Sequence, residues 1–349
     1  MSLLSDDVLA TTVTRDPETD TTPPTARKLK GALGPSDRVF RGVARGSGVV
    51  VLLIMTLVGV FLTFRAFQAL QVAGFSFLTV QDWDPDGGVG HFGVAAVIVG
   101  TMLIAVVAIA VAVPLATATS LYIAEYAPER IKRTLISIVD LMAAVPSVVF
   151  GLWGFFLLQP NTTNLSRWIS THFGWFPLFK VDGYDTSDPL ASETVFTSSS
   201  FIAGLVVGLM ITPLLTSIMR EAFSQAPVGE REGAYALGAT KWGMIRSVVL
   251  PFGKGGMIGG TMLGLGRALG ETITVFMIIS PIFVIQPHIL QNGGSSVSSL
   301  IALRYGEATQ FGTSALMAAG LALFLITLAV NFVASSIVAR SRSGAASDA

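Results

Sequence analysis

The sequence contains no cysteine and has few charged residues. The absence of cysteine excludes disulfide bonds and thiolate metal sites. Asp, Glu, Lys and Arg make up 13% of the 349 residues, whereas they make up roughly a quarter of an ordinary soluble protein. Hydrophobic residues reach 52%, and the mean hydropathy is +0.68. Because a soluble domain of this length has too little interior to bury so much apolar surface, the composition predicts an all-α polytopic membrane protein.

Further absences exclude several classes of function. The 22 basic and 22 acidic residues cancel, so the overall charge does not indicate nucleic-acid binding. His91, His172 and His288 are scattered in polar segments and predict no metal site, and no other motif indicates a cofactor. No G-x-x-x-x-G-K-S/T loop occurs, so any nucleotide hydrolysis must come from another chain. The sequence also lacks H-E-x-x-H and a Ser–His pair at membrane depth, which argues against an intramembrane enzyme.

The chain begins with a polar segment and continues with six apolar ones. Residues 1–37 are rich in Thr, Asp and Pro and are predicted to be a disordered tail. Each apolar segment is close to the ~20 residues that a bilayer-spanning helix needs. The predicted spans are 48–70, 94–120, 134–158, 200–219, 256–284 and 313–338. Pro114, Pro146 and Pro213 fall inside spans, where kinks are tolerated if neighbouring helices satisfy the freed carbonyls.

The basic residues predict the orientation of these spans. Most Lys and Arg residues lie in the N-terminal tail, two alternate loops and the C-terminus, whereas the remaining loops hold only Arg65, Arg167, Lys180 and Arg304. By the positive-inside rule, both termini are cytoplasmic, including a C-terminal tail at 339–349. The predicted outer loops are 65–93, 159–199 and 285–312. The first of them carries Asp82, Asp84 and Asp86, which could meet a soluble partner or could simply be a solvated connector.

The loop at residues 220–254 has the pattern of a helix, a glycine turn and a second helix. Its acidic start, "GEREGAYALG", suits a helix N-terminus, and Gly238 is placed to end that helix in a left-handed cap. The second helix, "TKWGMIRSVVL", is predicted to stop at Pro251. Apolar residues such as Leu237 and Trp242 would offer a small knob to a partner groove. The alternative is an amphipathic hairpin that lies on the membrane.

This loop resembles that of a known family. Residues Glu232 to Pro251 read E-G-A-x-x-x-G-A-T-x-x-x-x-I-x-x-V-V-L-P, which resembles the EAA loop of permease subunits of binding-protein-dependent ABC importers. The resemblance implies that the loop is a coupling helix that docks into a cleft of a cytoplasmic ATPase. The implied coupling residues are Glu232, Ala234, Leu237, Gly238 and Pro251. One departure is Gly233, where the motif usually has alanine, and this lowers local helix propensity by about 1 kcal/mol.

Three further stretches narrow the resemblance. "LYIAEYAPERIKR" at 121–133, "VPSVVFGLWGFF" at 145–156 and "LGLGRALGET" at 263–272 are similar to PstC-type membrane subunits of phosphate ABC importers. The resemblance implies a type I ABC importer permease fold over residues 94–338, preceded by a first transmembrane helix and outer loop at 38–93. It implies phosphate as substrate and the cytoplasmic membrane of a bacterium as the location.

The resemblance also implies partners and leaves alternatives open. The implied partners are a homologous PstA-like permease, a PstB-like dimer of ATP-binding subunits, an extracytoplasmic PstS-like phosphate-binding protein and membrane lipid. One alternative is an importer of another oxyanion, such as sulfate or molybdate. A second is an ion-coupled secondary transporter, which would need internal repeats and several intramembrane carboxylates. No persuasive repeat is evident, Glu271 is the only carboxylate deep in a predicted span, and Asp140 lies nearer a boundary.

The fifth span, which contains "GLGRALGETITVFMIIS", carries Arg267 and Glu271. A charge at mid-bilayer costs ~2.5–3.5 kcal/mol on insertion scales, so both side chains must face protein or water. Residues four apart share one helical face and can pair. The pair is therefore either a structural ion pair or a polar site on the substrate pathway, where a guanidinium suits phosphate oxygens.

Small residues surround this pair in the sequence. Gly256, Gly260 and Gly264 repeat every four residues, and so do Gly266 and Gly270. Such spacing lets helix backbones approach closely in lipid, so the density of glycine predicts either tight packing or a moving interface. The hydroxyls of Thr272 and Thr274 are expected to bond back to carbonyls of their own helix.

Overall fold

The computed structural model describes residues 34–87, 92–184 and 192–342. The predicted tail at residues 1–33, His91 and the end of the C-terminal tail at 343–349 lie outside the described residues. The chain divides into two units, Met1–Ile54 and Met55–Ala349. The interactions described below all lie within the second unit.

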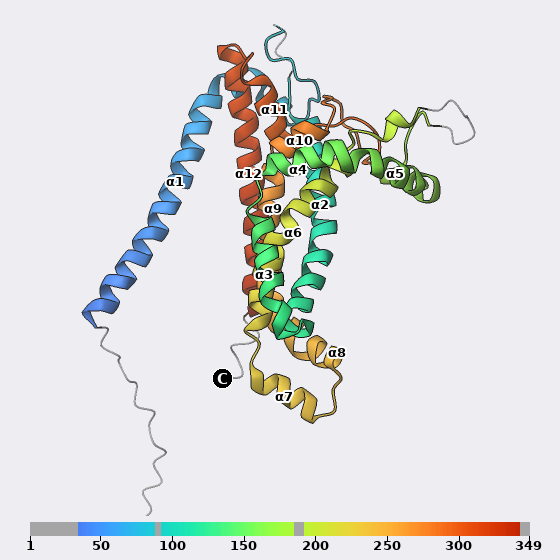
Figure 1. Cartoon of the computed structure of the whole chain (residues 1–349). Helices are drawn as coiled ribbons and strands as arrows, with labels where there is room; N and C mark the ends of the chain where they lie inside the picture. Colours follow the sequence, from blue (N-terminus) through green and yellow to red (C-terminus); the bar gives the residue numbers. More distant parts are fainter. Residues whose placement is uncertain (1–33, 88–91, 185–191, 343–349) are drawn as a thin grey trace, which may run out of the picture. The chain divides into compact units, whose positions relative to one another are not determined.

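The described residues form helices joined by loops (Figure 1). Their order is α1 Pro35–Ala73, α2 Ala95–Leu121, α3 Glu129–Ala143, α4 Ser147–Trp153, α5 Gln159–Phe173, α6 Ser200–Ser224, α7 Val228–Ala236, α8 Lys241–Met244, α9 Leu250–Gly270, α10 Ile273–Ile278, α11 Val297–Arg304 and α12 Gln310–Arg342. Five helical stretches are long and apolar enough to cross a membrane, and a bent pair makes a sixth if it is counted as one span. The predicted all-α, six-span architecture is thus confirmed for the described residues.

The first helix is longer than the sequence predicted. α1 begins at Pro35, although the first span was expected to begin near Gly48 and the tail to continue to residue 37. Proline suits the first turn of a helix because its missing N–H would have no partner there. Near its other end, α1 packs against α12, where Ser314 Oγ donates to Arg65 O at 2.7 Å and accepts from Ala69 N at 3.2 Å.

The third predicted span, 134–158, is not one straight helix. The stretch Glu129–Ala143 meets Ser147–Phe173 at 89°. The break precedes Pro146, which has φ −60° and ψ 141°. Proline removes a donor and pushes the preceding residue away from helical geometry. Pro114 and Pro213, in contrast, lie inside α2 and α6.

The fifth predicted span, 256–284, is also broken. α9 ends at Gly270, Glu271 adopts an extended conformation with φ −67° and ψ 124°, and the short helix α10 follows. At its other end α9 extends further than predicted. A π-helical turn, Ile245–Val249, joins α8 to α9, so the helical path from Lys241 to Gly270 forms one candidate span. Pro251 therefore lies in the first turn of α9 and does not end a helix.

The main core is formed where α2, α6 and α9 lie side by side (Figure 1). A Cβ added to Gly208 of α6 would lie 2.9 Å from Ala108 O of α2, and one added to Gly256 of α9 would lie 2.1 Å from Ala222 Cβ of α6. Gly260 and Gly264 meet α6 in the same way. The close packing predicted for Gly256, Gly260 and Gly264 is therefore confirmed.

The second glycine set behaves differently. Nothing lies within 4 Å of a Cβ added to Gly266 or Gly270. These two residues are therefore not closely packed within this chain, and the alternative of a moving interface stays a prediction. They leave an open strip of backbone on the last turns of α9, next to Arg267.

Candidate functional site

The two helix breaks meet in a buried polar contact. Glu271 is 9% exposed, and its Oε1 accepts hydrogen bonds from Thr274 N at 3.1 Å and Thr274 Oγ1 at 2.9 Å. Thr274 Oγ1 also lies 3.2 Å from Ser147 O, at the start of α4. A Cβ added to Gly151 of α4 would lie 3.2 Å from Thr274 Cα. The half-helices α4 and α10 are therefore packed against each other at the point where each span breaks.

These contacts correct the hydrogen bonds expected from the sequence. Thr272 Oγ1 does donate to a nearby carbonyl, Gly270 O, at 3.3 Å. Thr274 does not bond back to its own helix but joins Glu271 to α4. A buried carboxylate needs donors, and Thr274 supplies two of them, one from its backbone and one from its side chain.

Arg267 lies on the last turn of α9 and is exposed. Among the ion pairs and side-chain hydrogen bonds of the described residues, none involves Arg267. The predicted pair between Arg267 and Glu271 is therefore wrong, because the chain leaves the helical path at Glu271 and the i,i+4 geometry is lost. A cation near a helix C-terminus is favoured by the helix dipole. The arginine is thus a free positive charge beside the open strip of Gly266 and Gly270.

At the other end of α9, the predicted helix–turn–helix is confirmed. α7 is followed by Gly238 with φ +82°, a left-handed conformation that glycine adopts without strain. α8 begins after Thr240, whose side chain accepts a hydrogen bond from Gly243 N at 3.1 Å. Leu237 is 91% exposed and Trp242 is 55% exposed. The element, which we call the coupling element (residues 228–244), therefore presents apolar side chains on its surface.

The structure places the other predicted coupling residues at different depths. Glu232 is exposed on α7, whereas Ala234 is half-buried and packs against the main core. Pro251 is exposed at the start of α9. Residues 232–238 thus lie in one continuous segment, and Pro251 is separate from it.

The coupling element is fastened to the end of α2 by contacts that the sequence did not reveal. Arg231 Nη1 lies 2.9 Å from Glu125 Oε1, and these side chains are 20% and 6% exposed. Arg231 Nη2 also donates to Phe223 O at 2.7 Å. The ammonium of Lys241 lies 4.6 Å from the centre of the Tyr126 ring. A lone acid such as Glu125, at the end of an apolar span, is the signal that could have indicated a buried partner.

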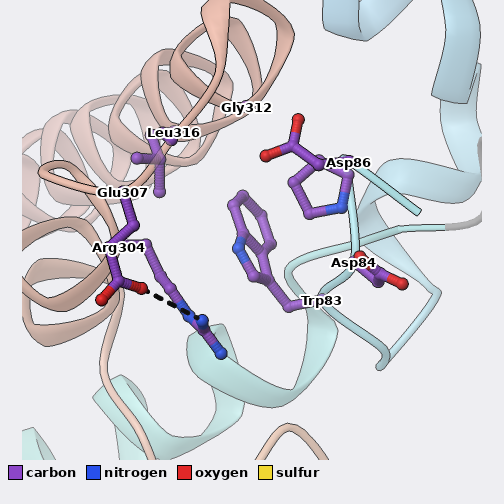
Figure 2. Close-up of a pocket in the computed structure, with 9 residues that line it drawn as sticks. Trp83, Asp84, Asp86, Arg304, Glu307, Gly312 and Leu316 are labelled. Atoms are coloured by element: carbon purple, nitrogen blue, oxygen red, sulfur yellow. Dashed lines mark ion pairs between the residues drawn. The ribbon is translucent and has the colours of Figure 1, made fainter. Parts of the chain in front are cut away.

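The opposite end of the molecule carries a polar hollow of about 350 Å³. Figure 2 shows the Trp83 indole between Arg304 and Asp86, with the Asp84 carboxylate pointing away from Arg304. Arg304 Nη1 lies 3.7 Å from Glu307 Oε2. Asp86 accepts a hydrogen bond from Thr309 Oγ1. Docking of a soluble partner on this acidic loop stays a prediction.

Comparisons with known proteins agree with this architecture. Residues 116–343 match the family described as the binding-protein-dependent transport system inner membrane component. The chain is 38% identical over 303 residues to the phosphate transport system permease protein PstC 2 of Mycobacterium tuberculosis, an alignment that covers 86% of this chain and 91% of that protein. It is 36% identical over 307 residues to the protein PstC of Pasteurella multocida, with 86% and 91% covered.

A solved structure shows the same fold. It is the crystal structure of a bacterial ABC transporter involved in the import of the acidic polysaccharide alginate, with a TM-score of 0.53 and 15% identity. The match covers 87% of this chain and 99% of that chain. The predicted ABC importer permease fold is therefore confirmed. The chain belongs to the family of binding-protein-dependent transport system inner membrane components and, within it, groups with the permease proteins named PstC.

Proposed function

We propose that this chain is the permease subunit of an ATP-driven importer that carries inorganic phosphate across the cytoplasmic membrane of a bacterium. The observation that carries the proposal is the 38% identity to a phosphate transport system permease over 86% of the chain. The likeness includes the region of both helix breaks and the coupling element, since the family match covers residues 116–343.

Arg267 is proposed to act on the substrate pathway. Its guanidinium is exposed and has no ion pair within the described part of this chain, while the neighbouring carboxylate of Glu271 is occupied by Thr274. The positive charge is therefore available to an oxyanion, for which the planar fork of N–H donors is well suited. Because an arginine at membrane depth must face protein or water, the open strip beside it is proposed to line a wet path or a partner helix. The role of Glu271 is then to hold the break in shape.

The coupling element is proposed to dock into an ATPase subunit. Its exposed apolar residue Leu237 would fill a groove of the partner, Gly238 would set the turn, and Ala234 would pack the element against the core. Glu232 would interact at the rim, and Pro251 would shape the first turn of α9. Since α9 continues from the coupling element to Arg267, a displacement of one end can be transmitted to the other along a single helical path.

The chain needs partners for this activity. It carries no nucleotide-binding loop, so a dimer of PstB-like ATPases would supply hydrolysis. A homologous PstA-like permease would cover the open strip on α9, and a PstS-like binding protein would deliver phosphate from outside. With both termini on the cytoplasmic side, the coupling element faces the ATPases and the hollow of Figure 2 faces the binding protein.

Uptake of radiolabelled phosphate tests the proposal. Cells that lack this gene are compared with the same cells complemented with it, and sulfate and molybdate are added as competitors. We expect uptake that needs the gene, persists in the presence of a protonophore and stops when ATP is depleted. Competition by sulfate or molybdate at equal concentration would indicate another oxyanion. Uptake that stops with the protonophore while ATP is maintained would indicate an ion-coupled transporter.

A further inference from the structure

A large hollow lies beside the seam where the end of α6 meets the start of α9. Its volume is about 850 Å³. The seam itself is close, since Gly253 and Gly256 of α9 approach Phe223 and Ala222 of α6. The hollow adjoins the coupling element in the sequence on both sides, because α6 leads into it and α9 leads out of it. With the proposed orientation, the hollow lies at the cytoplasmic boundary of the membrane.

Two cations line this hollow. Arg220 is four residues before the end of α6, and Lys254 is in the second turn of α9. The Arg220 side chain is 21% exposed, and its ion pair with Glu221 is long, at 3.9 Å. Lys254 is exposed and makes no ion pair or side-chain hydrogen bond within the described part of the chain.

One carboxylate, that of Glu221, lines the hollow and makes the long ion pair with Arg220. Glu221 is 61% exposed, and its Oε1 accepts a hydrogen bond from Gln225 Nε2 at 3.2 Å. Asp140 is not part of the lining, and it accepts a hydrogen bond at 2.6 Å from Oγ of Ser217, which is part of it. Arg220 and Lys254 therefore have N–H donors that no carboxylate of the lining contacts at hydrogen-bond distance.

Besides the charged residues, the wall of the hollow contains Ser217 and Gln225, and the rest of it is apolar. The apolar part includes Ile218, Ala222, Pro251 and Phe252, and Phe252 is 47% exposed. A free inorganic phosphate gains nothing from such a wall, whereas a phospholipid has both an anionic headgroup and acyl chains. Basic pockets between transmembrane helices on the cytoplasmic side are suited to anionic lipid headgroups. Long cationic side chains near helix ends also reach toward the interface.

We propose that this hollow binds the headgroup of an anionic phospholipid of the inner leaflet. Arg220 and Lys254 hold the phosphate of the headgroup, and Phe252 with Ile218 lies against the first carbons of the acyl chains. The lipid thereby fills the outside of the α6–α9 seam next to the coupling element. This site is separate from Arg267, which lies at the opposite end of α9, and its lipid binding does not depend on which solute is transported.

Lipid retention tests the proposal. The importer complex that contains the full-length chain is purified, and native mass spectrometry measures the binding of phosphatidylglycerol and phosphatidylcholine. We expect phosphatidylglycerol to be retained about 10-fold or more in preference to phosphatidylcholine. The preference should be lost in Arg220→Gln/Lys254→Gln. It should be kept in the matched control Arg130→Gln/Arg133→Gln, which removes two exposed cations from α3.

Two further measurements distinguish binding of a lipid from binding of free inorganic phosphate. Phe252→Ser should weaken phosphatidylglycerol retention while both cations stay in place. Excess inorganic phosphate should not displace the lipid. The proposal is overturned if wild-type complex shows no preference for phosphatidylglycerol, if both double variants behave alike, or if inorganic phosphate displaces the lipid. The wild-type comparison needs no substitution, so it decides the matter even if a variant does not assemble.

Discussion

The two ends of α9 differ in how their functional side chains are satisfied. At the Gly270 end, the buried Glu271, Thr274 and Ser147 O satisfy one another within the chain. At the Leu250 end, α9 leads into the coupling element, which exposes Leu237 almost completely. Among the described residues, its one ion pair is Glu125–Arg231. The break after Gly270 is held in shape by contacts within the chain, whereas the coupling element exposes apolar surface that another protein can cover. This difference predicts which substitutions will disturb the structure of the chain and which will weaken its binding to other subunits.

The largest effect on assembly is expected from Leu237→Asp. Since Leu237 is 91% exposed, its replacement should change the folding stability of the chain little. Burying a leucine at an interface contributes roughly 1.5–3 kcal/mol, so ATPase binding should weaken about 10- to 100-fold and uptake should fall with it. Co-purification of the ATPase with tagged permease measures the effect. Tyr305→Asp, at the opposite end and 58% exposed, is the control and should leave co-purification unchanged. Full ATPase retention in Leu237→Asp would place the docking surface elsewhere.

A smaller effect is expected from Glu125→Gln. The substitution leaves Arg231 without the carboxylate that lies 2.9 Å away, and loss of an interaction with a charged group costs about 1.5–3 kcal/mol. The coupling element should loosen, and ATP-driven uptake should fall several-fold. A double-mutant cycle with Arg231→Gln isolates the pair. The double variant should be little worse than either single variant, and fully additive losses would show that the two side chains act independently.

Thr274→Val tests the opposite end of α9 and should have a moderate effect. Valine keeps the shape but removes the hydroxyl that contacts Glu271 and Ser147 O. A hydrogen bond of this kind contributes about 1 kcal/mol, so we expect uptake to fall roughly 3- to 10-fold with assembly intact. Thr274→Ser keeps the hydroxyl and should retain most uptake. Full uptake in Thr274→Val, or a loss in Thr274→Ser as large as that in Thr274→Val, would contradict the role given to the hydroxyl.

The smallest effect is expected in the loops far from the coupling element. A hydrogen bond from Lys180 lowers the pKa of Asp182, and His288 adds to this. Because the pKa is depressed in the folded state, the stabilisation is present above the ordinary aspartate value of about 3.9 and is lost as pH falls through the lower folded value. Asp182→Asn should therefore lower thermal stability slightly at pH 7 and by less near pH 3. Thermal unfolding of purified complex at both pH values measures this, and an unchanged difference at the lower pH would contradict it.

The sequence predicted the parts of the fold that depend on local pattern. The spacing of Gly256, Gly260 and Gly264 indicated close helix packing, and Gly238 indicated a left-handed cap, and both are present. Local pattern did not predict the helix breaks. Pro146 breaks its span, but Pro213 lies inside an unbroken α6 packed between neighbours, so tertiary packing decides the result.

The candidate site was only partly predictable for the same reason. Arg267 and Glu271 were expected to pair because their spacing fits a continuous helix, and the break after Gly270 removes that geometry. Glu125 and Arg231 are too far apart in the sequence for any local pattern to join them. Their contact follows from the way the coupling element folds back onto the end of α2.

The central claim is that Arg267 serves the anion and not the assembly of the complex. The most direct measurement compares phosphate uptake and subunit co-purification in Arg267→Gln and Arg267→Lys. We predict that Arg267→Gln reduces uptake to background while the complex assembles normally, and that Arg267→Lys, which keeps the charge but loses the planar fork, retains part of the uptake. Normal uptake in Arg267→Gln, or loss of the assembled complex, would contradict the claim.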